Sequence, residues 1–178
     1  MHGILYKSLK EFVVDQYGRD TWNEIRAEAS VGSKLYLPVS TYEDEELFEL
    51  VRAAAAVIDQ KAEDLLEPFG EIIAAQLLDA YGNLVSPDWT AIDLVEHTEE
   101  HIHTVLRTHN PELTPPELEC QRQSDDRVIV RYQSERELCG VAIGIVRGVA
   151  AHYGETISVS EHRCMHSGDP YCEFIVSA

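Results

Sequence analysis

The residue pattern changes near Asn110, and this change constrains the fold more than any other feature of the sequence. Before it, apolar residues recur at helical spacing, as at Leu5, Leu9 and Phe12. After it, prolines interrupt the chain, and the following segments are short and separated by turn residues. The pattern therefore predicts helices first and a small antiparallel sheet with one helix afterwards, which is an α+β fold.

Six helices and four strands are expected from this pattern. The helices cover residues 4–17, 21–29, 44–59, 62–81, 88–108 and 139–153, where either Asp88 or Thr90 opens the fifth. The strands cover residues 117–123, 127–132, 155–163 and 171–176. With 178 residues, 44% of them hydrophobic, the chain is predicted to form one domain with its own core.

The charge of the chain limits its partners. Its 14 basic and 32 acidic residues give a formal net charge of −18, which argues against binding to nucleic acid or to anionic membranes. No apolar run is long enough to span a bilayer, and residues 1–7 lack the pattern of a signal peptide. A cytoplasmic location is therefore expected.

The motif Y-x-S-x-R lies at the end of the second predicted strand. Alternate side chains of a strand share one face, so Tyr132, Ser134 and Arg136 are expected to point the same way. Two hydroxyl groups and a guanidinium fork suit the binding of carboxylates. On spacing alone, a solvated strand edge is the favoured interpretation.

Four histidines lie in or just after the fifth predicted helix, at positions 97, 101, 103 and 109. His97 and His101 are four apart and can share a helix face, as metal ligands do. The segment reads H-T-E-E-H, so the H-E-x-x-H signature of zinc proteases is absent. Spacing alone selects none of these histidines, and surface histidines on an acidic helix explain them equally well.

These features occur together in an order that resembles the haem nitric oxide/oxygen binding (H-NOX) family, which includes the haem domain of soluble guanylate cyclase. The resemblance covers essentially the whole chain. It rests on Met1-His2-Gly3, Phe69-Gly70-Glu71, the histidine helix, the segment Pro115 to Cys120, and Y-x-S-x-R. It implies a haem between a distal helical lobe (residues 1–60) and a proximal lobe with the sheet (residues 61–178).

The resemblance also assigns the iron ligand. The family's proximal histidine lies about a dozen residues before its proline pair, and His103 lies twelve residues before Pro115. His103 therefore matches the ligand, whereas His97 and His101 do not. A neutral imidazole nitrogen is a good ligand for haem iron.

Further pocket residues follow from the same resemblance. Tyr132, Ser134 and Arg136 match the residues that hold the haem propionates, and Pro116 matches the proline that presses on the porphyrin and distorts it.

The distal side is expected to be apolar. Oxygen-binding members of the family use a distal tyrosine, and Val141 occupies that position here, nine residues after Tyr132. Ile73 and Leu5 match two further distal positions. A pocket without a hydrogen-bond donor favours nitric oxide and carbon monoxide over oxygen.

The cysteines predict a second metal site. Cys139, Cys164 and Cys172 match cysteines that bind zinc in some bacterial members, and tetrahedral zinc needs a fourth ligand. His162 is expected to supply it, with His166 or Glu161 as the alternatives.

The resemblance implies a haem-based gas sensor and not an enzyme. Ferrous haem b, five-coordinate through His103, binds nitric oxide or carbon monoxide, and the bond to His103 then weakens or breaks. The helix is released, the haem relaxes against Pro116, and the lobes rotate, which signals to a separate partner. In bacteria the family's partners are sensor histidine kinases and cyclic-di-GMP enzymes.

Two other hypotheses remain. One is a zinc- and thiol-based redox sensor built on the cysteine cluster, with haem secondary. The other is a haem peroxidase, which is disfavoured because no distal acid/base pair is found among the positions that can be assigned.

Overall fold

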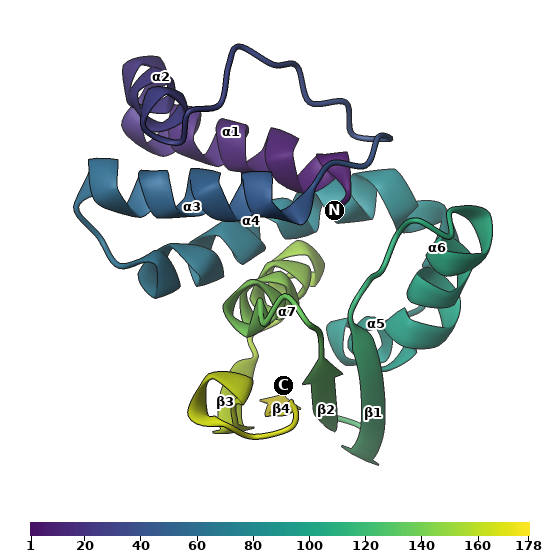
Figure 1. Cartoon of the computed structure of the whole chain (residues 1–178). Coiled ribbons are helices and arrows are strands. Elements are labelled where there is room, and N and C mark those ends of the chain that lie inside the picture. Colours follow the sequence, from purple (N-terminus) through teal and green to yellow (C-terminus); the bar gives the residue numbers. More distant parts are fainter.

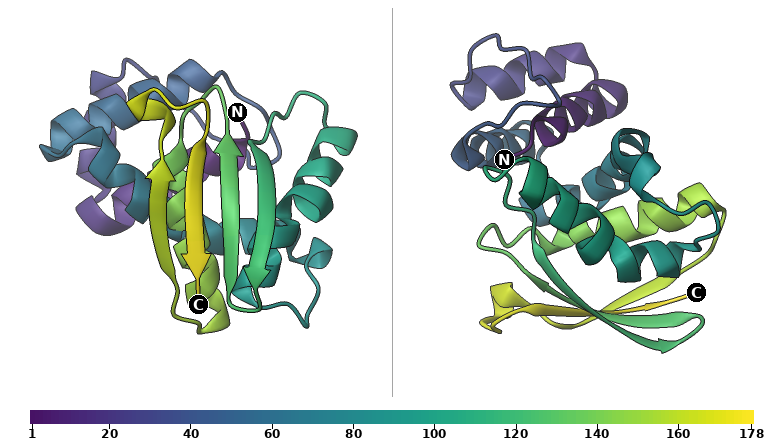
Figure 2. Two further views of the ribbon diagram at one scale, coloured as in Figure 1. Left: turned by 90° about the horizontal axis from the view of Figure 1, so that it is seen from below. Right: turned by 90° about the vertical axis from the view of Figure 1, so that its right-hand side faces the viewer.

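A computed structural model describes all 178 residues and shows helices layered on one face of a four-stranded sheet (Figures 1 and 2). The α-helices are α1 (Gly3–Tyr17), α2 (Arg19–Glu28), α3 (Asp44–Ile58), α4 (Ala62–Tyr81), α5 (Ala91–Thr98), α6 (Thr104–His109) and α7 (Cys139–Tyr153). Three short helical segments are η1 (Gly82–Leu84), η2 (Glu99–His103) and η3 (Met165–Ser167). The strands are β1 (Glu117–Ser124), β2 (Arg127–Gln133), β3 (Ser158–Arg163) and β4 (Cys172–Ser177). The predicted α+β fold is confirmed.

The sheet is antiparallel throughout, with strand order β1-β2-β4-β3. Alternate residues of the two central strands, β2 and β4, line its inner face. Four of them are buried: Val128, Val130, Phe174 and Val176. These side chains pack against residues of α5 and α7, so one face of the sheet carries the lower core (Figure 2, right).

Helix α7 crosses α4 at very close range, which positions the wall between the upper and lower layers. A Cβ atom at Gly144 would lie 2.0 Å from the carbonyl oxygen of Glu67, and one at Gly70 would lie 2.3 Å from that of Val141. Only glycine permits this approach of two backbones. The glycine of the Phe69-Gly70-Glu71 motif is thereby explained.

The upper layer consists of α1, α2 and α3 (Figure 1). Its core also includes Phe69 and Ile73 of α4 and Val141 of α7. Because α4 contributes to the cores above and below it, this helix joins the two layers. The expected lobe boundary at residue 60 falls in the short connection between α3 and α4.

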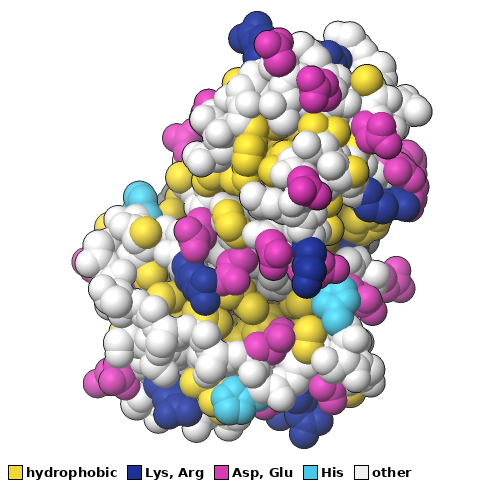
Figure 3. All heavy atoms as spheres, turned by 90° about the vertical axis from the view of Figure 1, so that its left-hand side faces the viewer, with side chains coloured by type: hydrophobic (Ala, Val, Ile, Leu, Met, Phe, Trp, Pro, Cys, Tyr) yellow, Lys and Arg dark blue, Asp and Glu magenta, His cyan; other side chains and the backbone are white.

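Acidic side chains are spread over the face shown in Figure 3, and the lysines and arginines of that face lie singly among them. No basic patch of the kind that binds nucleic acid is present on this face. No helix combines the length and the apolar character that crossing a membrane requires.

In the structure, the segment predicted as one fifth helix is divided into three parts, α5, η2 and α6. Thr90 caps α5, and its side chain and that of Asp93 form a reciprocal capping box. The helix is then interrupted at Glu99–His103 by a turn of π-helix before α6 begins. A π-turn has one extra residue per turn, and apolar periodicity does not reveal it.

Candidate functional site

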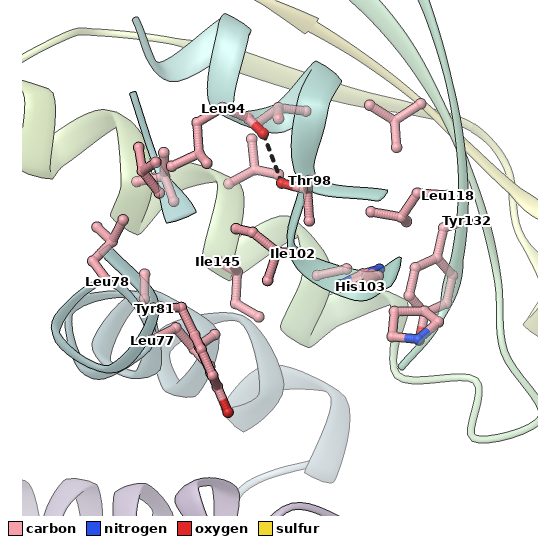
Figure 4. A pocket seen from close by; sticks show the side chains of 18 of the residues that line it. Leu77, Leu78, Tyr81, Leu94, Thr98, Ile102, His103, Leu118, Tyr132 and Ile145 are labelled. Atoms are coloured by element: carbon pink, nitrogen blue, oxygen red, sulfur yellow. Dashed lines mark hydrogen bonds between the residues drawn. The ribbon is translucent and has the colours of Figure 1, made fainter. Parts of the chain in front are cut away.

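Two adjoining cavities, of about 180 and 200 Å³, lie between the upper helices and the sheet. Both are lined mainly by hydrophobic side chains, and they share Leu77, Tyr81, His103, Leu106, Pro116, Tyr132, Ala142 and Ile145. In Figure 4, His103 and Tyr132 lie on one side of the space and Leu77 and Tyr81 lie on the other. An apolar cavity of this kind, with few polar groups, is typical of a cofactor site.

His103 is the histidine that the structure brings to both cavities. It ends the π-turn, and its side chain is only 12% exposed. His97 and His101 instead flank Trp89, with ring centroids 5.0 and 5.1 Å from the indole, and line neither cavity. His109 is bonded to the Val105 carbonyl of its own helix. The geometry thus singles out the histidine that the resemblance assigned.

Glu99, one turn before His103, fixes the orientation of the imidazole. Its carboxylate lies 3.1 Å from His103 Nδ1, and it also accepts hydrogen bonds from Arg107 Nη1 at 2.5 Å and from the Leu118 amide at 3.1 Å. Burial acts to raise the pKa of Glu99, but these donors outweigh burial and hold the pKa at about 2. An ionised carboxylate only accepts, so Nδ1 donates and Nε2 is the ring nitrogen left for a ligand.

The motif Y-x-S-x-R straddles the end of β2. Tyr132 belongs to the strand and is buried, whereas Ser134 and Arg136 lie in the turn before α7; all three line the second cavity. The three residues were expected to share one face of a strand, but only Tyr132 lies in β2. The positions of the Ser134 and Arg136 side chains depend on the turn. Burial raises the pKa of Tyr132 to about 12, so its hydroxyl stays protonated.

Arg136 is held by two neighbours. Its Nε donates to Asp44 at 2.6 Å, and its terminal nitrogens donate to the carbonyl and hydroxyl oxygens of Thr114. Asp44 also pairs with the N-terminal amino group at 2.7 Å. Burial acts to raise the pKa of Asp44, but the two cations outweigh burial and lower the pKa below its ordinary value.

The predicted distal residues, Leu5, Ile73 and Val141, all line the second cavity. Sequence reasoning missed a polar pair in the same lining: the hydroxyl of Tyr81 lies 2.9 Å from Nε2 of His2. This pair joins the start of α1 to the end of α4. The only signal in the sequence was the tyrosine closing an apolar helix, which does not reveal its partner.

The three predicted cysteines lie together, and the fourth possible ligand beside them is the alternative Glu161 and not His162. Cys164 Sγ lies 3.9 Å from Cys139 Sγ and 4.0 Å from Cys172 Sγ. The potential ligand atoms of these thiols and of Glu161 all lie within 4.8 Å of one another, and His162 and His166 are not in the group.

A β-bulge explains why Glu161 replaces His162. In a regular strand, His162 and Cys164 share a face because they are two residues apart. The register of β3 shifts between Glu161 and Arg163, which adds one residue and turns Glu161 to the same side as Cys164. A bulge is set by pairing with the neighbouring strand, so the sequence alone could not choose between His162 and the alternative Glu161.

Two thiols of the cluster, those of Cys139 and Cys172, are buried. Burial, and then the neighbouring thiols, raise the pKa of Cys139, and burial also raises that of Cys172. Cys120 lies apart from them, and its thiol faces the Val95 carbonyl. Without a metal, Cys139 and Cys172 therefore stay protonated, a state in which thiols react slowly with oxidants.

A comparison with known families matches residues 2–161 to the family described as Haem-NO-binding. The chain belongs to the H-NOX family. H-NOX proteins bind haem, and the H-NOX domain is a sensor domain and not a catalytic one. The predicted resemblance and the predicted sensor class are thereby confirmed.

Solved H-NOX structures match this H-NOX chain over almost its whole length. An H-NOX protein from S. oneidensis, crystallised in the Fe(II)NO ligation state, is 28% identical, with a TM-score of 0.90 over 99% of this chain and 98% of that one. An unliganded Fe(II) H-NOX protein from K. algicida is 21% identical, with a TM-score of 0.86 over 99% and 96% of the two chains, and shows the shared fold.

Among curated proteins, this H-NOX chain is similar to soluble guanylate cyclases. It is 26% identical to soluble guanylate cyclase gcy-35 of Caenorhabditis elegans, over 93% of this chain and 25% of that protein. Soluble guanylate cyclase 89Da of Drosophila melanogaster is 19% identical over 76% of this chain and 20% of that protein. The chain thus spans about a quarter or less of the length of these relatives.

Proposed function

We propose that this H-NOX domain is a gas sensor in which His103 would hold the iron of a ferrous haem b. The observation that carries the proposal is the setting of His103, which borders both apolar cavities with Nδ1 occupied by Glu99. A histidine bound in this way presents Nε2 in a fixed tautomer, as metal-ligating histidines do.

The residues around the cavities suit a haem. Its apolar macrocycle requires a hydrophobic lining, which the shared residues of both cavities provide. Its two propionates require donors, and Tyr132, Ser134 and Arg136 all line the second cavity. We assign Pro116, which borders both cavities beside His103, to the contact that presses on the macrocycle.

When bound, haem supplies a ferrous iron that takes a diatomic gas as a further ligand. Leu5, Ile73 and Val141 would form the wall on the gas side, and none of these side chains carries a hydrogen-bond donor. The polar pair in the same lining, Tyr81 and His2, is hydrogen-bonded to itself. Such a wall favours nitric oxide and carbon monoxide, which depend less on a donor than oxygen does.

The signal is proposed to begin at His103. If gas binding weakens the bond between His103 and the iron, the π-turn that contains His103 would become free to move relative to Pro116. The distal lobe, residues 1–60, and the proximal lobe, residues 61–178, then rotate relative to each other, which is a two-state switch biased by the ligand. A sensor histidine kinase or a cyclic-di-GMP enzyme is the proposed partner.

The test is the absorption spectrum of the purified ferrous protein with and without nitric oxide, for the wild type and for His103→Gly. The variant is expected to lose haem or to hold it weakly, and added imidazole should restore the five-coordinate spectrum. His97→Ala and His101→Ala are matched controls from the same helix and should behave like the wild type. Normal haem content and coordination in His103→Gly would overturn the proposal.

We also propose a structural zinc ion at the cysteine cluster, because three thiols and the Glu161 carboxylate converge there from α7, β3, the residue that follows β3, and β4. Three sulfur ligands and one oxygen ligand complete a tetrahedral set. Such an ion would tie α7, and with it Val141, to the sheet. The redox-sensor hypothesis is less well supported, because burial raises the pKa of the thiols Cys139 and Cys172.

A further inference from the structure

We propose that Glu99 is a positioning residue that sets the strength of His103 as a ligand and joins His103 to Pro116 and to the start of β1. The proposal rests on the proposed role of His103. It adds a residue that was not singled out in the sequence, and a route from the iron ligand into the sheet.

The first observation is the hydrogen bond from His103 to Glu99, at 3.1 Å within the same π-turn. A carboxylate that accepts the Nδ1 proton gives the ring more imidazolate character and raises the basicity of Nε2. A more basic ligand binds iron more tightly and favours its oxidised form. Glu99 would therefore strengthen the bond that the gas must break.

The second observation is the pair of bonds that stabilise the same carboxylate. Arg107 donates to Glu99 Oε1 at 2.5 Å, and with its other terminal nitrogen it donates to the Pro116 carbonyl at 3.1 Å. The Leu118 amide, at the start of β1, donates to Glu99 Oε2 at 3.1 Å. Glu99 Oε2 thus bonds both His103 and Leu118.

This arrangement gives displacement of His103 a direct path. If His103 moves, Glu99 Oε2 must lose its hydrogen bond to either His103 or Leu118. A shift of Glu99 also displaces Arg107, which is bonded to the Pro116 carbonyl. Leu118 pairs with Tyr132 across the β1–β2 ladder, so a change at Leu118 reaches the strand that ends in Y-x-S-x-R. Because one half-buried carboxylate accepts the hydrogen bonds from His103, Arg107 and Leu118, a change in one bond alters the others.

Replacing Glu99 and replacing Arg107 are expected to change the strength of His103 as a ligand in opposite directions, which makes the proposal testable. Replacing Glu99 by Gln weakens the acceptor on Nδ1, so His103 becomes a weaker ligand. Replacing Arg107 by Met removes a cation that draws charge from Glu99, so the carboxylate becomes a stronger acceptor and His103 a stronger ligand. General loosening of the fold would change both variants in the same direction.

The experiment uses the haem-loaded chain and measures the resonance Raman band of the iron–histidine bond together with the haem midpoint potential. Glu99→Gln is expected to lower the band frequency and make the potential more positive, and Arg107→Met is expected to do the reverse. Glu100→Gln is the matched control, since Glu100 lies on the same turn near His97 and His101 and is not bonded to His103. Glu99→Gln that matches the wild type in both readouts, or two variants that shift in the same direction, would overturn the proposal.

Amide hydrogen exchange at Leu118 tests the path into β1. In the wild type, exchange at this amide is expected to become faster when nitric oxide is added, and in Glu99→Ala it should be fast with or without the gas. An amide that is protected equally in all four samples would refute the path. Haem content separates the two proposals: a chain that loads haem independently of His103 contradicts the proposed function, whereas normal loading with unshifted spectra in Glu99→Gln contradicts only the role of Glu99.

Discussion

Gly144 provides the sharpest test of how α4 and α7 position the cavity wall. A Cβ atom added there would lie 2.0 Å from the Glu67 carbonyl oxygen and 2.8 Å from Gly70 Cα. Ordinary contacts of this kind are about 3.5 Å or longer, so the helices would have to separate by about 1 Å or more. Gly144→Ala is therefore expected to destabilise the protein through overpacking.

The magnitude follows from measured overpacking costs, which are about 1–3 kcal/mol for an added methyl group in a packed core. For a chain of this size each kcal/mol lowers the melting temperature by about 2–4 °C, so a decrease of about 2–12 °C is expected. Because Val141 and Ile145 border the cavity from the same helix, the shift should also change the rate of carbon monoxide binding.

The assay is urea unfolding followed by circular dichroism, with Gly82→Ala as the matched control. Gly82 has helical φ of −59° and nothing within 4 Å of an added Cβ, so alanine there should be neutral or stabilise by about 0.4–1 kcal/mol. If Gly144→Ala unfolds within about 0.5 kcal/mol of Gly82→Ala, the inferred close contact between α4 and α7 is wrong.

Three further predictions concern pH, zinc and gas selectivity. Asp44 has a lowered pKa in the folded state, so its contribution to stability is present above the ordinary carboxyl value of 3.8 and is lost as the pH falls through the folded value. In urea unfolding, the wild type should lose stability below about pH 4 more steeply than Asp44→Asn does, and equal slopes would contradict the pairing. Elemental analysis should find about one zinc per chain in the wild type and none in Cys172→Ser. Glu161→Ala should lower the zinc content and His162→Ala should not; the reverse result would mean that the bulge is misassigned. The ferrous wild type should stay five-coordinate in air, whereas Val141→Tyr is expected to gain some oxygen affinity; a stable oxygen complex of the wild type would mean that a donor, such as the Tyr81 hydroxyl of the same lining, reaches the gas.

The order of helices and strands could be predicted from the sequence because it depends on local patterns. The repeat of apolar residues in α4 and α7 predicted both helices with the bounds that the structure shows. Alternation and turn residues likewise predicted the four strands, although β3 begins at Ser158 and not at Glu155. Periodicity reports which face is buried, and this holds before any partner is known.

Spacing did not select the histidine that is proposed as the iron ligand. Among four histidines in one segment, only the resemblance to a family selected His103, and the fold then placed His103 at the cavities and His97 and His101 beside Trp89. The role of Glu99 was invisible in the sequence because its partners, Arg107 and Leu118, converge only when the π-turn packs against β1.

Tertiary structure also decided the fourth member of the cysteine cluster. In the sequence, Cys164 and Cys172 flank one turn and Cys139 opens the preceding helix, and His162 was the expected fourth ligand, with His166 or Glu161 as the alternatives. The bulge in β3, which forms through pairing with β4, brings Glu161 to the side of Cys164. Local sequence encodes the period of a strand, but the extra residue that breaks the period is fixed by hydrogen bonds to a neighbour distant in the chain.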